Sequence, residues 1–345
     1  MGTQLRSVGR RRGGCPPLGS ATGDLKLIDR VDALVRAVGV RDRLSVVHLR
    51  NRVRRDAHYG AGPGTVYEIG SVTKTMTSLL FAEAVDSGGL RADTTAGSLL
   101  DLDGSDAAGV TLEELASHRS GLPRIATGAK NRIGAIAAVV RHRNPYTASL
   151  SGLLAQARSA KVVARGQFSY SNLGAALPGQ ALAAHHEAMY PELLHRHLFS
   201  PLGMRQSTVP LVTGDLPPDA PTGWDARGTA EQAWTMGAYA PAGGVRSTPD
   251  DMARYAQALL DDAVPGCAAL TPRWNADSQS RVGYGWFTDR IDGLEVTWHN
   301  GATGGFASMV ALDRTGAAAV VVLANTAVAL DDIAILLLLD DMLGR

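Results

Sequence analysis

The stretch Ile69-Gly70-Ser71-Val72-Thr73-Lys74-Thr75 decides how this chain of 345 residues is interpreted. A strand-like run ends at Gly70, and the apolar residues that follow recur at the spacing of a helix. Because residues three apart share one face of a helix, we expect Lys74 to point toward Ser71. A serine at the N-terminus of a helix, beside a basic group, has the features of an activated nucleophile.

A purely structural role fits the same spacing. Ser71 could cap the helix while Lys74 is a solvated residue of its first turn. Lys74 could take the serine proton only if burial or nearby positive charge lowered its pKa. The motif therefore needs support from other parts of the chain.

The composition argues against disorder and against a highly charged partner, because 45% of the residues are hydrophobic, 19% are charged and the formal net charge is +1. Two arginine clusters, Arg10–Arg12 and Arg50–Arg55, lack the aromatic or motif context of a nucleic-acid surface. We therefore expect no nucleic-acid partner.

Cysteine content and apolar runs bear on localisation. Cys15 and Cys267 are too few for a disulfide framework. The first residues include the arginines of a signal peptide but no apolar segment after them, and the longest apolar runs, 317–324 and 334–339, are too short to cross a bilayer. We expect a cytoplasmic protein without a stable membrane anchor, or a secreted or periplasmic one if the true start codon lies elsewhere.

Strand patterns lie at the two ends of the chain, and helical patterns lie between them. Asp24 can cap a first helix, and the runs Leu44–Leu49 and Val53–Tyr59 read as a hairpin followed by a short strand at Val66–Ile69. The remaining predicted elements are helices at Thr111–Ala116, Ile133–Arg143, Leu150–Ala157, Leu173–His186, Pro191–Leu198 and Asp250–Leu260, strands at Gly283–Phe287, Leu294–His299, Phe306–Leu312 and Ala317–Leu323, and a closing helix at Asp331–Leu343.

This order predicts an α+β fold with two lobes: an antiparallel sheet built from the N- and C-terminal strands and flanked by helices, plus a mostly helical lobe. We expect residues 1–23 to be a disordered tail and residues 24–345 to be a single catalytic domain. Within that domain the α/β lobe would comprise 24–70 and 282–345, and the helical lobe about 71–281.

Two further stretches support the opening motif: Phe168-Ser169-Tyr170-Ser171-Asn172-Leu173-Gly174 before a helix, and Trp298-His299-Asn300-Gly301-Ala302-Thr303-Gly304-Gly305-Phe306 between two strands. With them the chain resembles the serine β-lactamase and penicillin-binding-protein superfamily. The order Ser-x-x-Lys, Tyr-x-Asn, His-x-Gly is similar to the branch of class C β-lactamases, family VIII esterases, D-aminopeptidases and D-alanyl-D-alanine carboxypeptidases. Leu115–Pro123, Leu198–Met204 and Pro241–Thr248 extend the resemblance.

The resemblance implies roles for four polar residues. Ser71 would be the acylated nucleophile, and Lys74 would help to deprotonate it. Tyr170 fills the position of a phenolate-type base, for which Lys74 would act as a tuner. Asn172 would hold Lys74 and hydrogen-bond the substrate.

The same resemblance implies an oxyanion hole made by the main-chain N–H groups of Ser71 and Ala302. Gly301 would leave its strand bare, so that substrate could lie along it. His299 departs from the lysine of β-lactamases and, being largely neutral at pH 7, is a poorer anchor for a substrate carboxylate. This departure favours esterases and aminopeptidases, although His299 could instead only hydrogen-bond Tyr170 or Ser71.

Other motifs are absent. The histidine pairs at 185–186 and 195–197 lack zincin spacing, so we expect no metal site and no cofactor. Gly60–Gly64 lacks the Gly-Lys-Ser/Thr of a phosphate loop, and Ser71 is not in a Gly-x-Ser-x-Gly elbow.

The sequence therefore predicts a metal-independent serine hydrolase that forms an acyl-enzyme. Its partner would be a small ester, amide or peptide, which makes it an esterase or a D-amino-acid-type peptidase. A β-lactamase or D-alanyl-D-alanine carboxypeptidase is the alternative within this class. A non-catalytic scaffold or β-lactam-like ligand sensor is the alternative from another class, and the oligomeric state stays open.

Overall fold

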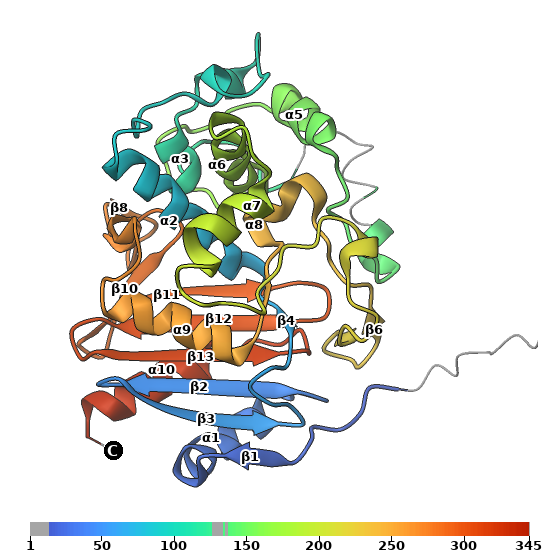
Figure 1. Ribbon diagram of the computed structural model, residues 1–345, viewed down its shortest axis with the longest axis vertical. Helices are drawn as coiled ribbons and strands as arrows, with labels where there is room; N and C mark the ends of the chain where they lie inside the picture. The colour runs from blue at the N-terminus through green and yellow to red at the C-terminus, as the bar shows by residue number, and fades with distance from the viewer. Residues whose placement is uncertain (1–13, 126–133, 135–136, 345) are drawn as a thin grey trace, which may run out of the picture.

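Strands from the two ends of the chain meet in one sheet (Figure 1). The computed structural model describes residues 14–125, 134 and 137–344. Within these residues the sheet has nine antiparallel strands in the order β1-β3-β2-β13-β12-β11-β10-β9-β8. Their bounds are Ala21–Gly23 (β1), Leu44–Arg50 (β2), Val53–Tyr59 (β3), Trp274–Asn275 (β8), Ser280–Val282 (β9), Phe287–Ile291 (β10), Leu294–Ala302 (β11), Ala307–Asp313 (β12) and Ala318–Ala324 (β13).

The pairing of β2 with β13 joins the two ends of the chain at the centre of this sheet. Val47 lies opposite Val321 in an antiparallel ladder of seven residue pairs. In the turn between β2 and β3, Asn51 and Arg52 both have positive φ angles, 50° and 64°. A two-residue hairpin turn of type I′ requires this conformation. The predicted hairpin and the predicted α+β fold are confirmed.

Both faces of the sheet are covered, which explains why β13 is apolar throughout. Its side chains alternate between two cores, as a strand's side chains must: Val320 and Val322 contribute to one, and Val321 and Leu323 to the other. The first core lies under α1 (Leu25–Ala37) and α10 (Asp331–Met342), and the second includes α9 (Pro249–Leu260), which packs on β2 and β13. A strand that is covered on both faces is apolar at nearly every position, and its sequence does not alternate between apolar and polar residues.

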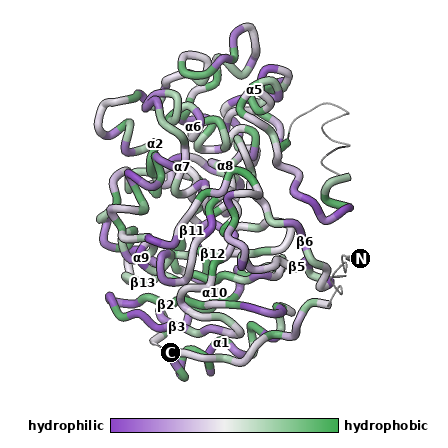
Figure 2. Tube along the Cα trace, turned by 45° about the vertical axis from the view of Figure 1, so that its right-hand side comes forward, coloured by the Kyte–Doolittle hydropathy of each residue, from purple (hydrophilic) through white to green (hydrophobic). Residues whose placement is uncertain are grey.

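The helical lobe surrounds α2 (Thr73–Asp86), which is buried along nearly its whole length. Figure 2 shows apolar segments in the interior strands and helices and hydrophilic ones at peripheral turns. The helices around α2 are α3 (Leu112–Ala116), α5 (Leu150–Ser159), α6 (Asn172–His185), α7 (Tyr190–Leu194) and α8 (Ala240–Gly243). Thr111 and Glu114 form a capping box at the start of α3.

Two short strand pairs lie at the boundary of the lobes. β4 (Tyr67–Glu68) pairs with β7 (Arg246–Ser247), and β5 (Gly223–Trp224) pairs with β6 (Ala230–Glu231). Strands of two residues carry no periodic signal, so sequence patterns did not indicate them. The first pair leads directly into the turn that holds Ser71.

The observed elements differ from the predicted ones in several places. The predicted strand at Gly283–Phe287 is wrong: apart from Phe287, which begins β10, these residues form the turn between β9 and β10. Ala21–Gly23, placed at the end of a disordered tail, form β1 and pair with β3. β8 belongs to the sheet and α9 packs on it, although the sequence predicted both in the helical lobe. The predicted helix at Ile133–Arg143 lies partly outside the described residues.

Over the described part of the chain, no helix combines the length and the apolar character needed to cross a membrane.

Candidate active site

A sharp turn holds Ser71 beside the end of β11. The turn is a single 3₁₀ turn, Gly70–Val72, between β4 and α2. Gly70 has a φ of +48°, and a Cβ atom there would lie 2.8 Å from the Ala302 amide nitrogen. Only glycine combines this backbone conformation with so close an approach. The Ser71 turn is therefore packed directly on β11.

Lys74 points at Ser71, as the helical spacing predicts. Its Nζ donates to Ser71 Oγ at 2.9 Å and to the Ala242 carbonyl oxygen at 2.6 Å. The side chain is buried, with 2% of its surface exposed. Burial, and secondarily the charge of Arg124, hold the pKa of Lys74 well below its usual range. A lowered pKa favours the unprotonated amine, which is the form of lysine that can accept a proton.

Tyr170 lies on the other side of Lys74, just before α6. Lys74 Nζ is 5.1 Å from the centre of the Tyr170 ring, and the Arg124 guanidinium is 5.5 Å from it. Burial raises the pKa of Tyr170 to about 12, although Ser71 and the Arg124 charge both act to lower it. Tyr170 is therefore a neutral phenol at pH 7, and not the phenolate that the resemblance implied.

The ring of His118 packs against that of Tyr170, with 4.3 Å between the ring centres. The Ser171 N–H donates to His118 Nδ1 at 3.2 Å, and burial holds the pKa of His118 well below its usual range. His118 is thus a neutral ring that supports the Tyr170 loop. It belongs to the Ser-His-Arg-Ser-Gly-Leu-Pro segment, which is similar to a loop of the family. The sequence indicated no role for this histidine.

His299 lies on the buried face of β11, with 1% of its surface exposed. Its Nδ1–H donates to the Asn300 carbonyl oxygen at 2.5 Å, which leaves Nε2 as an acceptor without a partner among the described residues. Its ring centre is 6.4 Å from that of Tyr170. Burial is the main cause that lowers the pKa of His299 to about 3, and repulsion from Lys74 adds to it whenever that lysine is protonated. The ring is neutral, so it brings no positive charge to the site.

Asn172 has a different partner from the one expected. Its Nδ2 donates to the Tyr146 hydroxyl at 2.8 Å, whereas Lys74 is held by the Ala242 carbonyl. The amide oxygen of Asn172 is buried and has no partner within the described residues. This oxygen is therefore available to a hydrogen-bond donor in the cleft.

Gly301 serves close packing, and not access for substrate along the strand. A Cβ atom on it would lie 2.1 Å from the Ile69 carbonyl oxygen and 3.0 Å from the Ser71 amide nitrogen. The next residue, Ala302, is exposed and lines the cleft. The main-chain N–H groups of Ser71 and Ala302 thus lie at one end of the same cleft.

A cleft of about 400 Å³ opens over Ser71, a volume within the usual range of small-molecule sites. One wall comes from β10 and β11, where the rings of Phe287 and Trp298 stack with 5.0 Å between their centres. The other residues that line it are Gly70, Arg124, Tyr146, Tyr170, Asn172, Trp234, Met236, Ala242, Gly243, Asn300 and Ala302.

Several of these lining residues escaped the sequence analysis. Trp298 and Asn300 flank His299 in the third motif, so alternation along the strand could have indicated that they face away from it. Arg124 directly follows the Ser-Gly-Leu-Pro segment. Trp234, whose ring centre is 5.4 Å from that of Tyr146, had no sequence signal.

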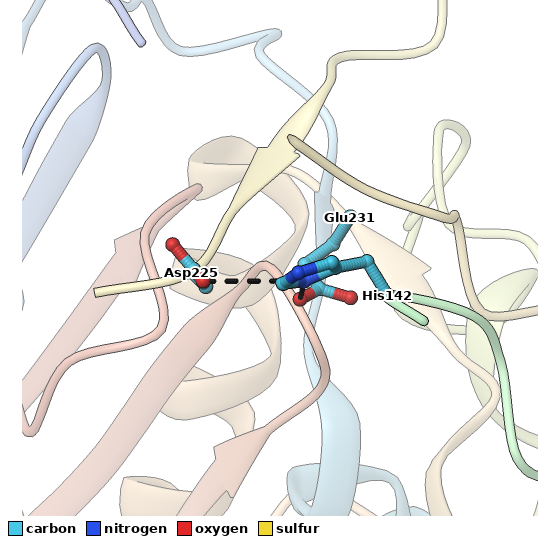
Figure 3. Close-up of side chains that lie close together, drawn as sticks. All are labelled: His142, Asp225 and Glu231. Atoms are coloured by element: carbon cyan, nitrogen blue, oxygen red, sulfur yellow. Dashed lines mark hydrogen bonds and ion pairs between the residues drawn. The ribbon is translucent and has the colours of Figure 1, made fainter. Parts of the chain in front are cut away.

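His142, Asp225 and Glu231 form a polar cluster (Figure 3). His142 Nδ1 is 2.6 Å from Glu231 Oε1 and 4.0 Å from Asp225 Oδ2. Over the described residues this is the group whose atoms lie close enough together to offer three metal ligands. The short His142–Glu231 contact joins β6 to the segment that leads to Tyr146, so we assign the cluster a structural role.

With this geometry in place, the chain was compared with known proteins. Residues 30–340 match the family described as Beta-lactamase. Among solved structures, a class C beta-lactamase from Rhodobacter sphaeroides superimposes with a TM-score of 0.73 at 20% identity, covering 88% of this chain and 95% of the other. Another class C beta-lactamase gives a TM-score of 0.75 at 19% identity, covering 88% and 91%. These structures share the fold.

Two curated proteins are similar in sequence. Penicillin-binding protein 4 of Amycolatopsis lactamdurans is 28% identical over 72% of this chain and 70% of its own length. Unguisins hydrolase ungD' of Aspergillus campestris is 25% identical over 76% of this chain. The chain spans about half of that second relative, 53% of its length.

Proposed function

Because the chain belongs to the beta-lactamase family, whose members are serine hydrolases, we propose that it hydrolyses a small ester or amide through an acyl-enzyme at Ser71. The observation that carries this proposal is the contact between Lys74 Nζ and Ser71 Oγ at 2.9 Å. A buried amine with a lowered pKa, in hydrogen-bond reach of a hydroxyl, is the arrangement that activates a nucleophile.

In acylation, Ser71 Oγ bonds to the substrate carbonyl carbon while its proton passes to Lys74 Nζ. The carbonyl oxygen becomes negative and accepts hydrogen bonds from the main-chain N–H groups of Ser71 and Ala302, each worth about 3–4 kcal/mol in hydrolases of this kind. The bond to the leaving group then breaks, and the proton moves from Lys74 to the leaving oxygen or nitrogen.

In deacylation, a water molecule attacks the acyl carbon and gives its proton to the same amine. The acid leaves, and the proton returns to Ser71 Oγ. Tyr170 takes part as a neutral phenol, which can receive a proton from Lys74 on one side and donate its own on the other. This assignment gives Lys74 the role of base and Tyr170 that of relay, since the pKa of Tyr170 is raised to about 12.

We place an esterase or a D-amino-acid-type peptidase first among the substrates. The neutral, buried His299 supports this order, because it offers no charge to the carboxylate of a β-lactam. The name of the unguisins hydrolase describes a hydrolase outside the β-lactamases. A β-lactamase or D-alanyl-D-alanine carboxypeptidase is the second candidate, favoured by the similarity to a penicillin-binding protein.

A non-catalytic ligand sensor would be expected to lack one of the catalytic residues. Ser71, Lys74 and Tyr170 are all present and lie close together, which argues against that role. The test is hydrolysis of a panel of short p-nitrophenyl esters, D-aminoacyl p-nitroanilides and nitrocefin. We expect turnover of at least one ester or anilide, and its loss in Ser71→Ala. Unchanged turnover in Ser71→Ala would overturn the proposal.

A further inference from the structure

The described lining of the cleft contains one charged side chain, and its charge bears on the kind of substrate that the cleft can bind. Among the described residues that line it, Arg124 is the one with a charged side chain, and the others carry aromatic, amide, hydroxyl, thioether or small side chains. Behind the lining, burial lowers the pKa values of the basic groups Lys74, His118 and His299, which favours their neutral forms. The positive potential of the cleft therefore comes mainly from Arg124.

Arg124 has no acidic partner among the described residues. Over the described residues, no carboxylate oxygen lies within 4.0 Å of its guanidinium, whereas arginines elsewhere, such as Arg158 and Arg165, form ion pairs. The segments outside the described ranges contain no aspartate or glutamate. An arginine with five N–H donors, unpaired by acid and facing a cleft, suits a planar anion.

Hydrogen bonds hold the main chain at Arg124, so its exposed side chain starts from a defined position beside the cleft. The N–H group of Asn172 donates to the Arg124 carbonyl oxygen at 3.0 Å, and Ser171 Oγ donates to the Pro123 carbonyl at 2.7 Å. These bonds attach the segment to the N-terminal end of α6, a helix of 14 residues whose dipole adds positive potential there. Arg124 therefore lies over Tyr170, on the helical side of the cleft, across from β11.

We propose that Arg124 binds a carboxylate of the substrate, so that the enzyme selects esters or amides that carry a negative charge a short distance from the scissile carbonyl. This inference rests on the proposed function, since it names the class of substrate for the same site. It also places the carboxylate of the substrate near the N-terminal end of α6. The carboxylate would then not bind at His299 on β11, the position at which β-lactamases have a lysine. The bound carboxylate would form the ion pair that Arg124 lacks within the protein.

The experiment compares matched esters that differ in one charge. Mono-p-nitrophenyl glutarate and its methyl ester place the carboxylate, or its neutral equivalent, on the acyl side. 4-Carboxyphenyl butyrate and its methyl ester place it on the leaving group. For each pair, the ratio of kcat/KM for the anionic to the neutral ester is measured in wild type and variants, which cancels differences in intrinsic reactivity.

We expect Arg124→Gln to lower this ratio about tenfold for at least one pair, the effect of losing one charge-assisted hydrogen-bonded contact. Arg124→Lys should retain part of the preference, and Arg124→Glu should reverse it. The matched control is Arg205→Gln, which removes an exposed arginine outside the cleft and should keep the wild-type ratio. Glutarate should inhibit wild type competitively and Arg124→Gln at least several-fold more weakly.

The pair that responds identifies which half of the substrate carries the anion. Equal ratios in wild type and Arg124→Gln for both pairs, with normal turnover and unchanged melting temperatures, would overturn this inference and leave the proposed function standing. If wild type turns over none of the esters and Ser71 does not become acylated, the proposed function fails and this inference fails with it.

Discussion

Gly301 touches the Ser71 turn where β11 passes it: a Cβ atom on Gly301 would lie 3.0 Å from the Ser71 amide nitrogen and 2.1 Å from the Ile69 carbonyl oxygen. The hydroxyl of Ser308 on β12 reinforces this contact by donating to Ile69 O at 2.7 Å. The position of the candidate nucleophile thus depends on a strand some 230 residues later in the chain.

Gly301→Ala should push β11 away from the Ser71 turn. We expect kcat/KM to fall by about 100-fold, because displacements of this size disrupt reacting geometry, and stability to fall by about 1–3 kcal/mol through overpacking. Urea denaturation and ester hydrolysis measure the two effects. Gly214→Ala is the control, since a Cβ there meets no atom within 4 Å. Wild-type activity in Gly301→Ala would contradict the proposed packing constraint.

Lys74→Met should abolish activity and yet stabilise the protein. The pKa of Lys74 is lowered in the folded state, so between that value and about 10.4 the unfolded chain binds a proton that the native protein lacks. Stability therefore rises with pH up to that limit, and the neutral amine is destabilising at pH 7. We expect the variant to melt roughly 1–2 °C higher at pH 7, equivalent to about 1 kcal/mol for a chain of this size.

This gain should shrink as the pH approaches 10, where lysine in the unfolded chain also loses its proton. Calorimetry of both proteins between pH 7 and 10 provides the comparison, with the same buffers and salt. A variant that is less stable than wild type throughout would show that Lys74 is charged in the native protein.

Acid should destabilise the protein partly through His299. Its pKa is about 3 in the folded state against about 6.5 when unfolded, so the unfolded chain takes up a proton first as pH falls from about 6.5. The loss is about 1.4 kcal/mol per pH unit between these values. His299→Gln should remove this part of the slope, while His185→Gln, at an exposed position, should leave it unchanged. Identical slopes in wild type and His299→Gln would refute the assignment.

The buried pair of Glu68 and Arg246 should be strongly coupled. The two residues are 2% and 1% exposed and form an ion pair. The main-chain N–H of Trp234 donates to Glu68 Oε1 at 2.9 Å. Arg246→Met should cost about 3–5 kcal/mol because it leaves a buried carboxylate unpaired, and adding Glu68→Gln should recover most of that loss. A double variant as unstable as the single one would argue against the coupling.

Much of the site could be predicted because its motifs are local. Ser71 and Lys74 are one helical turn apart, and Tyr170 and Asn172 directly precede a helix, so short stretches carry their chemistry. The fold class followed from where strand and helix patterns occur along the chain. β13 was readable as a strand because a run of apolar, β-branched residues between turns is typical of a buried strand.

What could not be predicted depends on contacts between distant segments. The partner of Lys74 is a carbonyl at Ala242, and Asn172 bonds Tyr146, but no spacing encodes either choice. Arg124 is significant only because the fold leaves it facing the cleft without an acid beside it. The neutral state of Tyr170 follows from burial, which an isolated motif does not show.

The central claim is that Ser71 becomes covalently acylated, and trapping with a fluorophosphonate tests it most directly. Folded protein is treated beside a known serine hydrolase, digested and examined by mass spectrometry. The account predicts one adduct, on the peptide that contains Ser71, and none in Ser71→Ala; labelling should slow markedly in Lys74→Met. Absence of an adduct on Ser71 while the reference enzyme is fully labelled would contradict it.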